Sequence, residues 1–462
     1  MSQLDGNIVL IALPTITRSL RATAFEALWV LMGYILMTAV TLLTFGRLAD
    51  MFGKVRLYTL GFAIFTIGSG ICSLATSGSL LVLFRLIQGI GAALIWANNA
   101  AILTDAFPPN ERGRAIGVNL VAGISGSVIG LILGGVLTAS LGWQSIFLIN
   151  LPIGAFATFW AYAKLKELGT VRHGRIDIPG NVLFAGGLTA FLAGLTLGAL
   201  SEYTATYVGL MILGVIMIVV FGYVELKVHN PLMDFKLFKI RAFTAGIVSN
   251  LLSSIARSGV SLVLTIYFQG ALVLDALTSG ILLVPFAVAF VIVGPLAGFL
   301  SDRYGARGFT TSGLAVSTAG FIGLALIPPG VSYQTLALLM ILVGIGGGMF
   351  VAPNIASIMS SVPVTERGVA SGMSATLVTT GSLLSLSMSF AILATSINST
   401  VLQAVFAGLP VPGGVPSIDV FLGPMHTIFA IMAGVSLVAI IPSALRGHGL
   451  TWIVESKQEQ VA

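Results

Sequence analysis

Charged side chains are scarce in this sequence of 462 residues, in which Asp, Glu, Lys and Arg together make up 8%. Soluble domains carry about 25%. Hydrophobic residues make up 56%, and the mean hydropathy is +1.04. So few charges cannot cover a globule of this size in water. The shortage therefore excludes an ordinary water-soluble domain and favours a protein that lies within a lipid bilayer.

Groups that carry covalent or metal chemistry are also few. The single cysteine, Cys72, lies in an apolar run and cannot form an internal disulfide. The four histidines form no cluster with catalytic or metal-ligand spacing, and no phosphate-binding Gly-x-x-x-x-Gly-Lys-Ser/Thr stretch is present. We therefore expect no catalytic residue, no metal, no cofactor and no direct use of ATP. An integral-membrane enzyme is an alternative, and it would need a catalytic cluster in a loop.

Apolar runs of about 20 residues, separated by short polar loops, are what the chain does contain. Each run fits a helix across a hydrocarbon core about 30 Å thick, so the sequence predicts an all-α membrane protein. The first run reaches only about 20 Å at 1.5 Å per residue, so we expect either that helix 1 lacks its first part or that it begins deep in the protein. The sequence predicts fourteen transmembrane helices, at residues 4–17, 26–47, 57–76, 80–104, 112–138, 143–165, 178–200, 206–227, 242–270, 276–299, 309–327, 334–360, 367–395 and 423–445.

The basic residues predict the orientation of these helices. With both termini in the cytoplasm, 18 of the 22 Lys and Arg residues fall in cytoplasmic loops, as the positive-inside rule requires. The predicted external loop 396–422 contains no Lys or Arg. Membrane topology therefore explains the net charge of +6, and we expect no nucleic-acid partner. We predict a multi-pass protein of the plasma (inner) membrane of a prokaryote.

Two short motifs occur twice in the chain. The first recurs after 252 residues, as Gly46, Leu48, Asp50 and Gly53 and again as Gly298, Leu300, Asp302 and Gly305. The second, at 108–117, recurs after 255 residues. Two motifs at nearly one spacing imply a duplicated unit. The sequence therefore predicts an N-terminal six-helix half (1–166), a linker with two inserted helices (167–240), a C-terminal six-helix half (241–450) and a cytoplasmic tail (451–462).

Four stretches resemble a known family. The loop 46–56 is similar to the signature loop of the major facilitator superfamily. Residues 4–14, 85–91 and 143–154 resemble the helix 1, helix 4 and helix 6 motifs of its fourteen-helix drug:proton antiporters. The resemblance implies the major facilitator fold, in which two pseudo-symmetric six-helix bundles rock around a midplane site. It also implies proton-coupled antiport and multidrug efflux.

The repeated loops predict a gating latch on the cytoplasmic side. Their glycines allow a tight turn and close helix approach, and Asp50 can accept hydrogen bonds from a helix amino terminus or pair with Arg56 or a partner helix. A solvated basic turn is the alternative. Asp105 is a candidate latch partner, for which solvation of the helix end is the alternative. The predicted latch residues are Gly46, Asp50, Gly53, Arg56, Asp105, Arg112, Gly298, Asp302 and Gly305.

Helix 5 carries a run of glycines that matches the antiporter motif. Such glycines permit bending and close packing against a neighbouring helix, and ordinary small-residue packing is the alternative. Leu131 stands where the family has a proline, which removes a kink-forming residue and weakens the inference of obligatory antiport. The glycines are Gly117, Gly126, Gly130, Gly134 and Gly135.

Asp5 and Arg85 are charges inside apolar helices, where charge is costly and marks functional positions. Burial disfavours an ionised carboxyl group, and a nearby arginine counteracts that effect. Asp5 is therefore the best candidate for a proton carrier tuned by Arg85, and a static Asp–Arg pair is the alternative. Arg85 shares one helical face with polar residues at spacings of three and four, which predicts a cavity lining that includes Gln88, Trp96 and Asn99.

Arg257 lies near the middle of the predicted helix 242–270, too deep to reach the interface easily. We expect it to need a carboxylate, a helix carboxyl end or an anionic substrate, and pairing with Asp5 or a backbone carbonyl is the alternative. Two intramembrane arginines against one aspartate favour an anionic, zwitterionic or neutral amphipathic substrate over a quaternary cation. Further predicted cavity residues are Asn250, Ser253, Ser261, Tyr34, Tyr267 and Gln269.

The sequence thus predicts a secondary active transporter that exports an amphipathic small molecule, such as a drug, an organic anion or a lipid-like compound, by proton-coupled alternating access. The alternative is a proton-independent facilitator or uptake carrier for an organic anion. The expected partners are the substrate, protons and the lipid bilayer, and the expected oligomeric state is a monomer.

Overall fold

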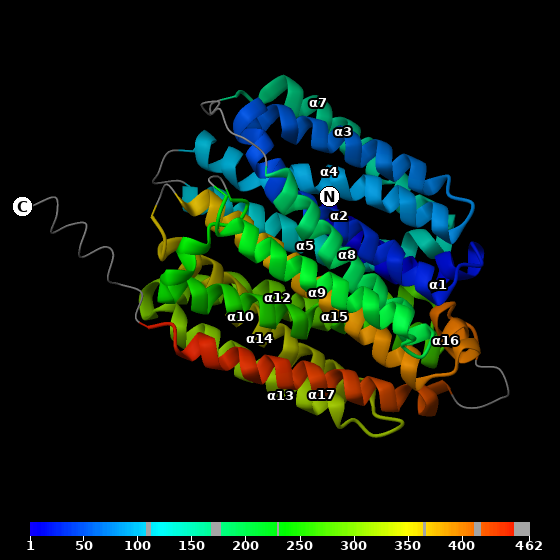
Figure 1. Cartoon of the computed structure of the whole chain (residues 1–462). Helices are drawn as coiled ribbons and strands as arrows, with labels where there is room; N and C mark the ends of the chain where they lie inside the picture. Colours follow the sequence, from blue (N-terminus) through cyan, green and yellow to red (C-terminus); the bar gives the residue numbers. More distant parts are fainter. Residues whose placement is uncertain (108–111, 168–176, 229–230, 364–365, 411–416, 448–462) are drawn as a thin grey trace, which may run out of the picture. The chain divides into compact units, whose positions relative to one another are not determined.

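The computed structural model of the chain (Figure 1) describes residues 1–107, 112–167, 177–228, 231–363, 366–410 and 417–447. Within these ranges every regular element is a helix. The elements are α1 (Ser2–Ser19), α2 (Ala24–Phe52), α3 (Lys54–Ser73), α4 (Gly78–Ala106), α5 (Arg112–Leu141), α6 (Ser145–Leu148), α7 (Asn150–Lys164), α8 (Ile178–Leu200), α9 (Ala205–Glu225), η1 (Phe235–Lys239), α10 (Arg241–Arg257), α11 (Val260–Ile266), η2 (Tyr267–Ala271), α12 (Ala276–Tyr304), α13 (Ala306–Ala325), α14 (Tyr333–Ser360), α15 (Arg367–Ser396), α16 (Ser399–Phe406) and α17 (Ser417–Ala444).

Helices occupy all fourteen predicted positions, but two of them are interrupted. The predicted helix 143–165 consists of α6 and α7, which meet at Ile149. The predicted helix 242–270 consists of α10, α11 and the π-helical turn η2, with a break at Ser258 and Gly259. The predicted loop 396–422 contains the short helix α16, which sequence analysis missed.

The number of membrane spans is smaller than predicted. Twelve helices among the described residues are long and apolar enough to cross a membrane, so the count of fourteen is not supported. The helix α1 is not among the twelve because Asp5, Asn7 and Arg18 interrupt its short apolar run. In α5 the described apolar stretch, Ser125–Leu141, is too short to qualify. The chain is therefore a multi-pass, all-helical membrane protein.

Local sequence explains where several helices begin. A capping box starts α2, since the Thr23 hydroxyl accepts from the Glu26 backbone N–H while the Glu26 carboxylate accepts from the Thr23 N–H. Asn398 caps α16 in a similar way. Gly53, with φ +102°, separates α2 from α3, and Gly305, with φ +86°, separates α12 from α13. Only glycine adopts this backbone region without strain, which accounts for glycine at the same place in both repeated loops.

The described chain forms two compact units. Unit 1 comprises residues 1–232, 258–284 and 382–428. In it α4 packs against α2 and α3, α1 against α5, α3 against α7, and α8 against α9 (Figure 1). Segments from late in the chain also belong to unit 1, because α11 and α16 both contact α1. The Gln403 side chain of α16 accepts from the Ala24 N–H at 2.7 Å and donates to the Ala22 carbonyl at 2.5 Å, and so binds the turn between α1 and α2.

Unit 2 comprises residues 233–257, 285–381 and 429–462. Here α13 packs closely against α14, and α10 also contacts α14. Hydroxyl groups join α13 to α17, as in the bond from Thr318 to Ser436 at 2.9 Å. Beyond the end of α17, burial lowers the pKa of Arg446 to about 10, and its guanidinium donates to Asn354 of α14.

The two helices between the predicted halves form a hairpin of their own. Glycines on the facing sides bring α8 and α9 together, since a methyl group on Gly214 would lie 2.6 Å from the Phe191 nitrogen. The hairpin contacts α2 through a hydrogen bond from Trp29 to Thr196 at 3.3 Å. The outer face of α9 exposes apolar side chains, including Ile212, Ile216 and Val219, as a surface in contact with lipid requires.

Candidate functional site: a buried ion pair with an amide cluster

The predicted pair of Asp5 and Arg85 exists in unit 1. The Arg85 Nη1 group donates to Asp5 Oδ2 at 2.5 Å, and both side chains are buried. The Arg85 Nε group donates to the Val30 carbonyl of α2 at 3.0 Å, which fixes the direction of the guanidinium. Two opposite charges with these bonds satisfy much of the hydrogen-bonding need that burial creates.

Two amide side chains complete the surroundings of the Asp5 carboxylate. Gln88 Nε2 donates to Asp5 Oδ1 at 3.0 Å, and Asn150 Nδ2 donates to the same oxygen at 2.8 Å. Gln88 Oε1 in turn accepts a hydrogen bond from Arg85 Nη1 at 2.7 Å. The predicted residues Asp5, Arg85 and Gln88 are thus brought together. Asn150 lies in the stretch 143–154 that resembles a family motif, and no local pattern indicates that it reaches α1.

Aromatic and sulfur-containing side chains close the cluster. The Tyr34 ring of α2 lies 4.2 Å from the Arg85 guanidinium carbon, a favourable cation–π arrangement. The Cys72 thiol of α3 contacts Gln88 Oε1 at 3.7 Å. Tyr34 was predicted as a cavity residue, and here its ring covers the ion pair from one side.

Close packing of α1 against α5 sets the position of Asp5. A methyl group on Gly130 would lie 2.7 Å from the Leu4 carbonyl oxygen, and one on Gly134 would lie 3.0 Å from that of Ile8. The glycines therefore allow the backbone of α1 to approach α5, as close packing through small residues does. Gly126 makes looser contact with Leu4, at 3.8 Å. The side chains around Gly117 lie outside the described part of the chain.

Two further glycine-dependent contacts join α5 to α12. A methyl group on Gly135 would lie 2.5 Å from the Leu277 Cα atom. A methyl group on Gly280 would lie 2.5 Å from the carbonyl oxygen of Leu131. Leu131, the residue in place of the family proline, is buried at this interface.

The other predicted residues of α4 lie away from the ion pair. Trp96 is exposed, and its indole N–H donates to the Ser2 hydroxyl at 2.8 Å. Asn99 donates to the Asn119 side chain of α5 at 3.1 Å. Both positions are compatible with a polar lining that continues along α4 and α1.

Arg257, in unit 2, has no carboxylate partner among the described residues. It is the last residue of α10, next to the break at Ser258 and Gly259, so the carboxyl end of this helix supplies some negative potential. Its guanidinium carbon lies 5.2 Å from the centre of the Phe290 ring, and its buried Nε group donates no hydrogen bond. Arg257 is half-buried, and a cation with a buried, unused donor is the arrangement expected of a site that receives an anionic or strongly polar group from a ligand.

The remaining predicted cavity residues are engaged elsewhere. Asn250 donates to Ser374 of α15 at 3.0 Å, and Ser253 is buried beside it on α10. In unit 1, Gln269 donates to the Ile11 carbonyl of α1 at 2.9 Å. Tyr267 is buried against Phe421, with ring centres 6.0 Å apart, and Ser261 is half-buried on α11.

The loop between α2 and α3 holds a contact that sequence analysis did not foresee. The Glu167 carboxylate accepts from the backbone N–H groups of Lys54 and Val55 at 2.9 and 3.0 Å, and so caps α3. A methyl group on Gly53 would lie 2.6 Å from this carboxylate. The predicted latch residue Asp105 pairs with Lys54 at 2.8 Å.

The other latch residues make fewer contacts. Arg56 is exposed, and nothing lies within 4 Å of a methyl group placed on Gly46 or Gly305. A methyl group on Gly298 would meet Ala352 at an ordinary 3.5 Å, and Asp302 is exposed. The side chains of two predicted latch residues lie outside the described part of the structure, namely Asp50 and Arg112.

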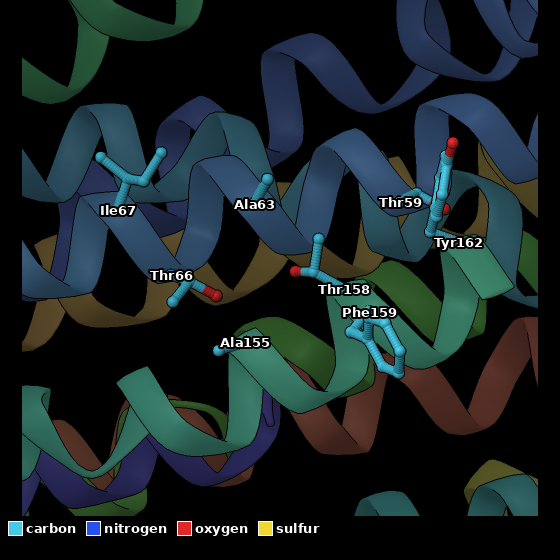
Figure 2. A pocket seen from close by; sticks show the side chains of 8 residues that line it. All are labelled: Thr59, Ala63, Thr66, Ile67, Ala155, Thr158, Phe159 and Tyr162. Atoms are coloured by element: carbon cyan, nitrogen blue, oxygen red, sulfur yellow. The ribbon is translucent and has the colours of Figure 1, made fainter.

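A shallow cavity of about 390 Å³ lies between α3 and α7, away from the ion pair. Figure 2 shows its lining of Thr59, Ala63, Thr66, Ile67, Ala155, Thr158, Phe159 and Tyr162. The three threonine hydroxyls donate to carbonyl groups of their own helices. A lining with no charge and with its hydroxyls already bonded suits a lipid chain better than a polar substrate.

The described residues contain no group of three or more His, Cys, Asp or Glu that could hold a metal ion.

Comparison with known proteins agrees with this architecture. The riboflavin transporter RibZ of Clostridioides difficile (strain 630) is 35% identical over 379 residues, which cover 82% of this chain and 82% of RibZ. The multidrug resistance protein Stp of Mycobacterium tuberculosis (strain CDC 1551 / Oshkosh) is 31% identical over 414 residues, which cover 88% of this chain and 76% of Stp. RibZ is named as a riboflavin transporter and Stp as a multidrug resistance protein, and these names favour a transporter over the enzyme alternative.

Solved structures show the same fold at low sequence identity. A bacterial homolog of the human lysosomal transporter Spinster, in an inward-facing and occupied conformation, superposes with a TM-score of 0.64 at 16% identity. The superposition covers 96% of this chain and 93% of that one. The family model described as "Major Facilitator Superfamily" matches residues 1–386 and 247–458. Because these matches span nearly the whole sequence, the chain belongs to the Major Facilitator Superfamily.

Proposed function

We propose that this transporter is a proton-coupled exporter of amphipathic small molecules. The observation that carries the proposal is the buried contact of Asp5 with Arg85, in which a carboxylate sits inside an apolar helix bundle. A buried carboxylate that exchanges its partner on protonation is a recurrent element of proton relays in membrane proteins. The resemblance to fourteen-helix drug:proton antiporters supports the same proposal.

In the proposed cycle Asp5 alternates between an ionised and a protonated form. The ionised form holds Arg85 through the bond to Oδ2, and Arg85 in turn holds the Val30 carbonyl of α2. Protonation removes the negative charge, weakens the hold on Arg85 and alters the contacts among α1, α2 and α4. A proton that enters down its gradient then offsets the free-energy cost of substrate export.

The proposed topology has fourteen spans, with α1 and α5 added to the twelve helices that qualify by length and hydropathy. In this arrangement residues 1–166 and 241–450 are the two halves, α8 and α9 are the insertion, and both termini lie in the cytoplasm. The loops of Asp50 and Asp302 act as latches on that side, and Glu167 and the Lys54–Asp105 pair support the first of these loops. The proposed location is the inner membrane of a prokaryote, and the proposed state is a monomer.

For the substrate we propose an anionic, zwitterionic or neutral amphipathic molecule. Arg257 supports this choice because its buried Nε donor is unused and no described carboxylate neutralises it. The names of the relatives also guide the choice, since RibZ is named for riboflavin and Stp for multidrug resistance.

The test uses the purified full chain in liposomes, with proton movement recorded by a trapped pH indicator. Riboflavin, fluorescein and ethidium serve as neutral, anionic and cationic probes. We expect proton movement on addition of riboflavin or fluorescein, and its loss in Asp5→Asn. Asp275→Asn, a change of an exposed carboxylate that caps α12, is the matched control and is expected to behave as wild type. Undiminished proton movement in Asp5→Asn would refute the coupling role.

The second candidate is a proton-independent carrier for uptake of an organic anion or riboflavin. Leu131 favours it, because the family proline that accompanies antiport is missing at this position of α5. Transport of a probe in both directions without proton movement, unchanged by Asp5→Asn, would support this candidate over the exporter.

A further inference from the structure

Asn150 belongs to the Asp5 cluster, and the proposed proton cycle gives it no task. It is fully buried at the first position of α7, directly after the break that separates α6 from α7. Its Nδ2 group donates to Asp5 Oδ1 at 2.8 Å and to the Ser69 hydroxyl at 3.0 Å. Its Oδ1 atom is buried and accepts no hydrogen bond. A buried acceptor without a partner is costly and calls for an explanation.

The two amides on Asp5 Oδ1 differ in their freedom to turn. Gln88 is held in one orientation, because its Oε1 accepts from Arg85 while its Nε2 donates to Asp5. A reversed Gln88 would direct its N–H groups at the guanidinium. Asn150 has no such restraint, because its Oδ1 atom accepts no hydrogen bond that a reversal of the amide would break. Of the two, only Asn150 can therefore present either a donor or an acceptor to Asp5.

We propose that Asn150 is a positioning residue whose amide reverses with the protonation state of Asp5; this rests on the proton coupling proposed above. With Asp5 ionised, Asn150 donates to Oδ1, as seen here. Arg85 remains charged and keeps a weaker contact with Oδ2, so the incoming proton binds Oδ1. The resulting O–H group then donates to Asn150 Oδ1, which becomes an acceptor when the amide turns about its last side-chain bond.

The reversal has a consequence at the junction of α6 and α7. The Ser69 hydroxyl now accepts from Asn150 and donates to the Phe147 carbonyl near the end of α6, at 2.9 Å. A reversed amide offers Ser69 an oxygen in place of an N–H group. The hydroxyl then turns from Phe147 to Asn150, and the Phe147 carbonyl is released. Protonation on α1 thereby changes the hydrogen bonds of α3 and of the α6–α7 break.

Other titratable groups face Asp5, and none of them replaces Asn150 in this scheme. Arg85 comes from α4, Tyr34 from α2 and Cys72 from α3, and the Met1 amino group lies close enough to interact with Asp5 electrostatically. Hydrogen bonds to Asp5 Oδ1 come from Gln88 and Asn150 only, among the described residues. A change at Asn150 therefore acts on the oxygen that takes up the proton.

The test measures proton uptake by Asp5 in the substrate-free, purified full chain. An infrared titration isolates its carboxyl band as the signal that disappears in Asp5→Asn. Asn150→Leu keeps a similar volume but removes the donor and the acceptor, and Asn150→Ala is the second variant if the first does not fold. We expect the titration midpoint to rise by about one pH unit, because a bond to the ionised form is stronger than one to the neutral form. Asn98→Leu is the control, since buried Asn98 donates only to the Leu94 carbonyl of its own helix.

A double-mutant cycle with Ser69→Ala tests the reversal itself. Ser69→Ala removes the acceptor that favours the present orientation of the Asn150 amide. We therefore expect the titration midpoint of Asp5 to rise in Ser69→Ala, but by less than in Asn150→Leu. In the Asn150→Leu background the same change should have no further effect, because the amide is absent. Additive shifts would refute the reversal, and an unchanged midpoint in Asn150→Leu would refute the role of Asn150. The absence of any carboxyl band that depends on Asp5 in the wild type would instead refute the proposed proton carrier.

Discussion

Asp5 of α1 and Arg257 of α10 differ by 252 residues, the same offset that relates the loops of Asp50 and Asp302. The two positions carry opposite charges and have opposite surroundings. Asp5 accepts hydrogen bonds from Arg85, Gln88 and Asn150, whereas Arg257 lies over Phe290 with an unused Nε donor. A charge with a complete set of partners is suited to switching between them. A charge without partners is suited to a ligand that brings its own.

The helix interfaces beside these two positions share close backbone contact and differ in their hydrogen bonds. On the α1 side, Gly130 and Gly134 allow backbone contact with α5. On the α10 side, a methyl group on Gly381 of α15 would likewise lie 2.9 Å from the Leu251 carbonyl oxygen. Hydrogen bonds add to that contact, from Asn250 to Ser374 at 3.0 Å and from Ser254 to the Val378 carbonyl at 2.7 Å. Backbone contact leaves little room for change, while side-chain hydrogen bonds can be broken and remade. The α10–α15 interface therefore combines backbone contact with side-chain hydrogen bonds that can adapt.

Arg85→Ala should have the largest effect on this comparison. Removal of one partner of a buried ion pair costs about 3–5 kcal/mol, because the other charge remains buried. We expect a strongly lowered midpoint of thermal unfolding in detergent. Arg257→Ala is the matched variant and should lower the midpoint far less, since no described carboxylate is left without a partner. Equal losses in the two variants would contradict the distinction between paired and unpaired arginines.

Gly130→Ala should have the next largest effect. The added methyl group would lie 2.7 Å from the Leu4 carbonyl oxygen, and backbone cannot move aside as a side chain can. We expect α1 to be displaced at a cost of about 1–3 kcal/mol, typical of overpacking, together with reduced proton-coupled transport. Gly123→Ala is the control on the same helix, because nothing lies within 4 Å of its added methyl group. The same stability in both variants would show that the α1–α5 interface tolerates separation.

Arg257→Ala should affect transport more than stability. We expect transport of the anionic probe fluorescein to fall about tenfold relative to that of ethidium, which corresponds to about 1.4 kcal/mol of lost interaction. Arg257→Lys keeps the charge and should retain most of the preference. The measurement is uptake into liposomes at matched protein content. A uniform loss for all probes would identify Arg257 as a structural residue.

Ser374→Ala should have the smallest effect. It removes the acceptor of the Asn250 side chain, and hydrogen bonds between membrane helices contribute about 0.6 kcal/mol on average. We expect a small decrease in the unfolding midpoint and little change in transport. Ser312→Ala, on an exposed face of α13, serves as the control because its hydroxyl bonds only to its own helix. A loss as large as that of Gly130→Ala would contradict the view that the hydrogen bonds of the α10–α15 interface can adapt.

Hydropathy and charge predicted most of the helices, because both signals act along the chain itself. The span 178–200 agrees with α8 at both ends. The breaks at Ile149 and at Ser258–Gly259 were missed, since the residues that flank them remain apolar or small and the hydropathy signal continues. The helix α16 was missed because its eight residues are too few to cross a membrane and lie in a stretch rich in turn formers.

The candidate site was predicted in part. Asp5 and Arg85 stood out because a charge in an apolar helix is rare and must find a partner. Gln88 followed from its spacing to Arg85 on one helix. Asn150 and Glu167 did not, because the first lies 145 residues from Asp5 and the second caps a helix 113 residues earlier in the chain. Neither contact leaves a periodic signal.

By itself the sequence determined that this chain resides in a membrane, where its helices run, and which two arginines and one aspartate lie within them. Those properties follow from composition and from the period of a helix, which neighbouring residues set together. Only the tertiary structure decided that Arg85 meets Asp5 while Arg257 meets a ring, and that an amide from α7 completes the first site. Such partners depend on how distant helices pack, and packing is decided by the fit of whole surfaces rather than by any short stretch of residues.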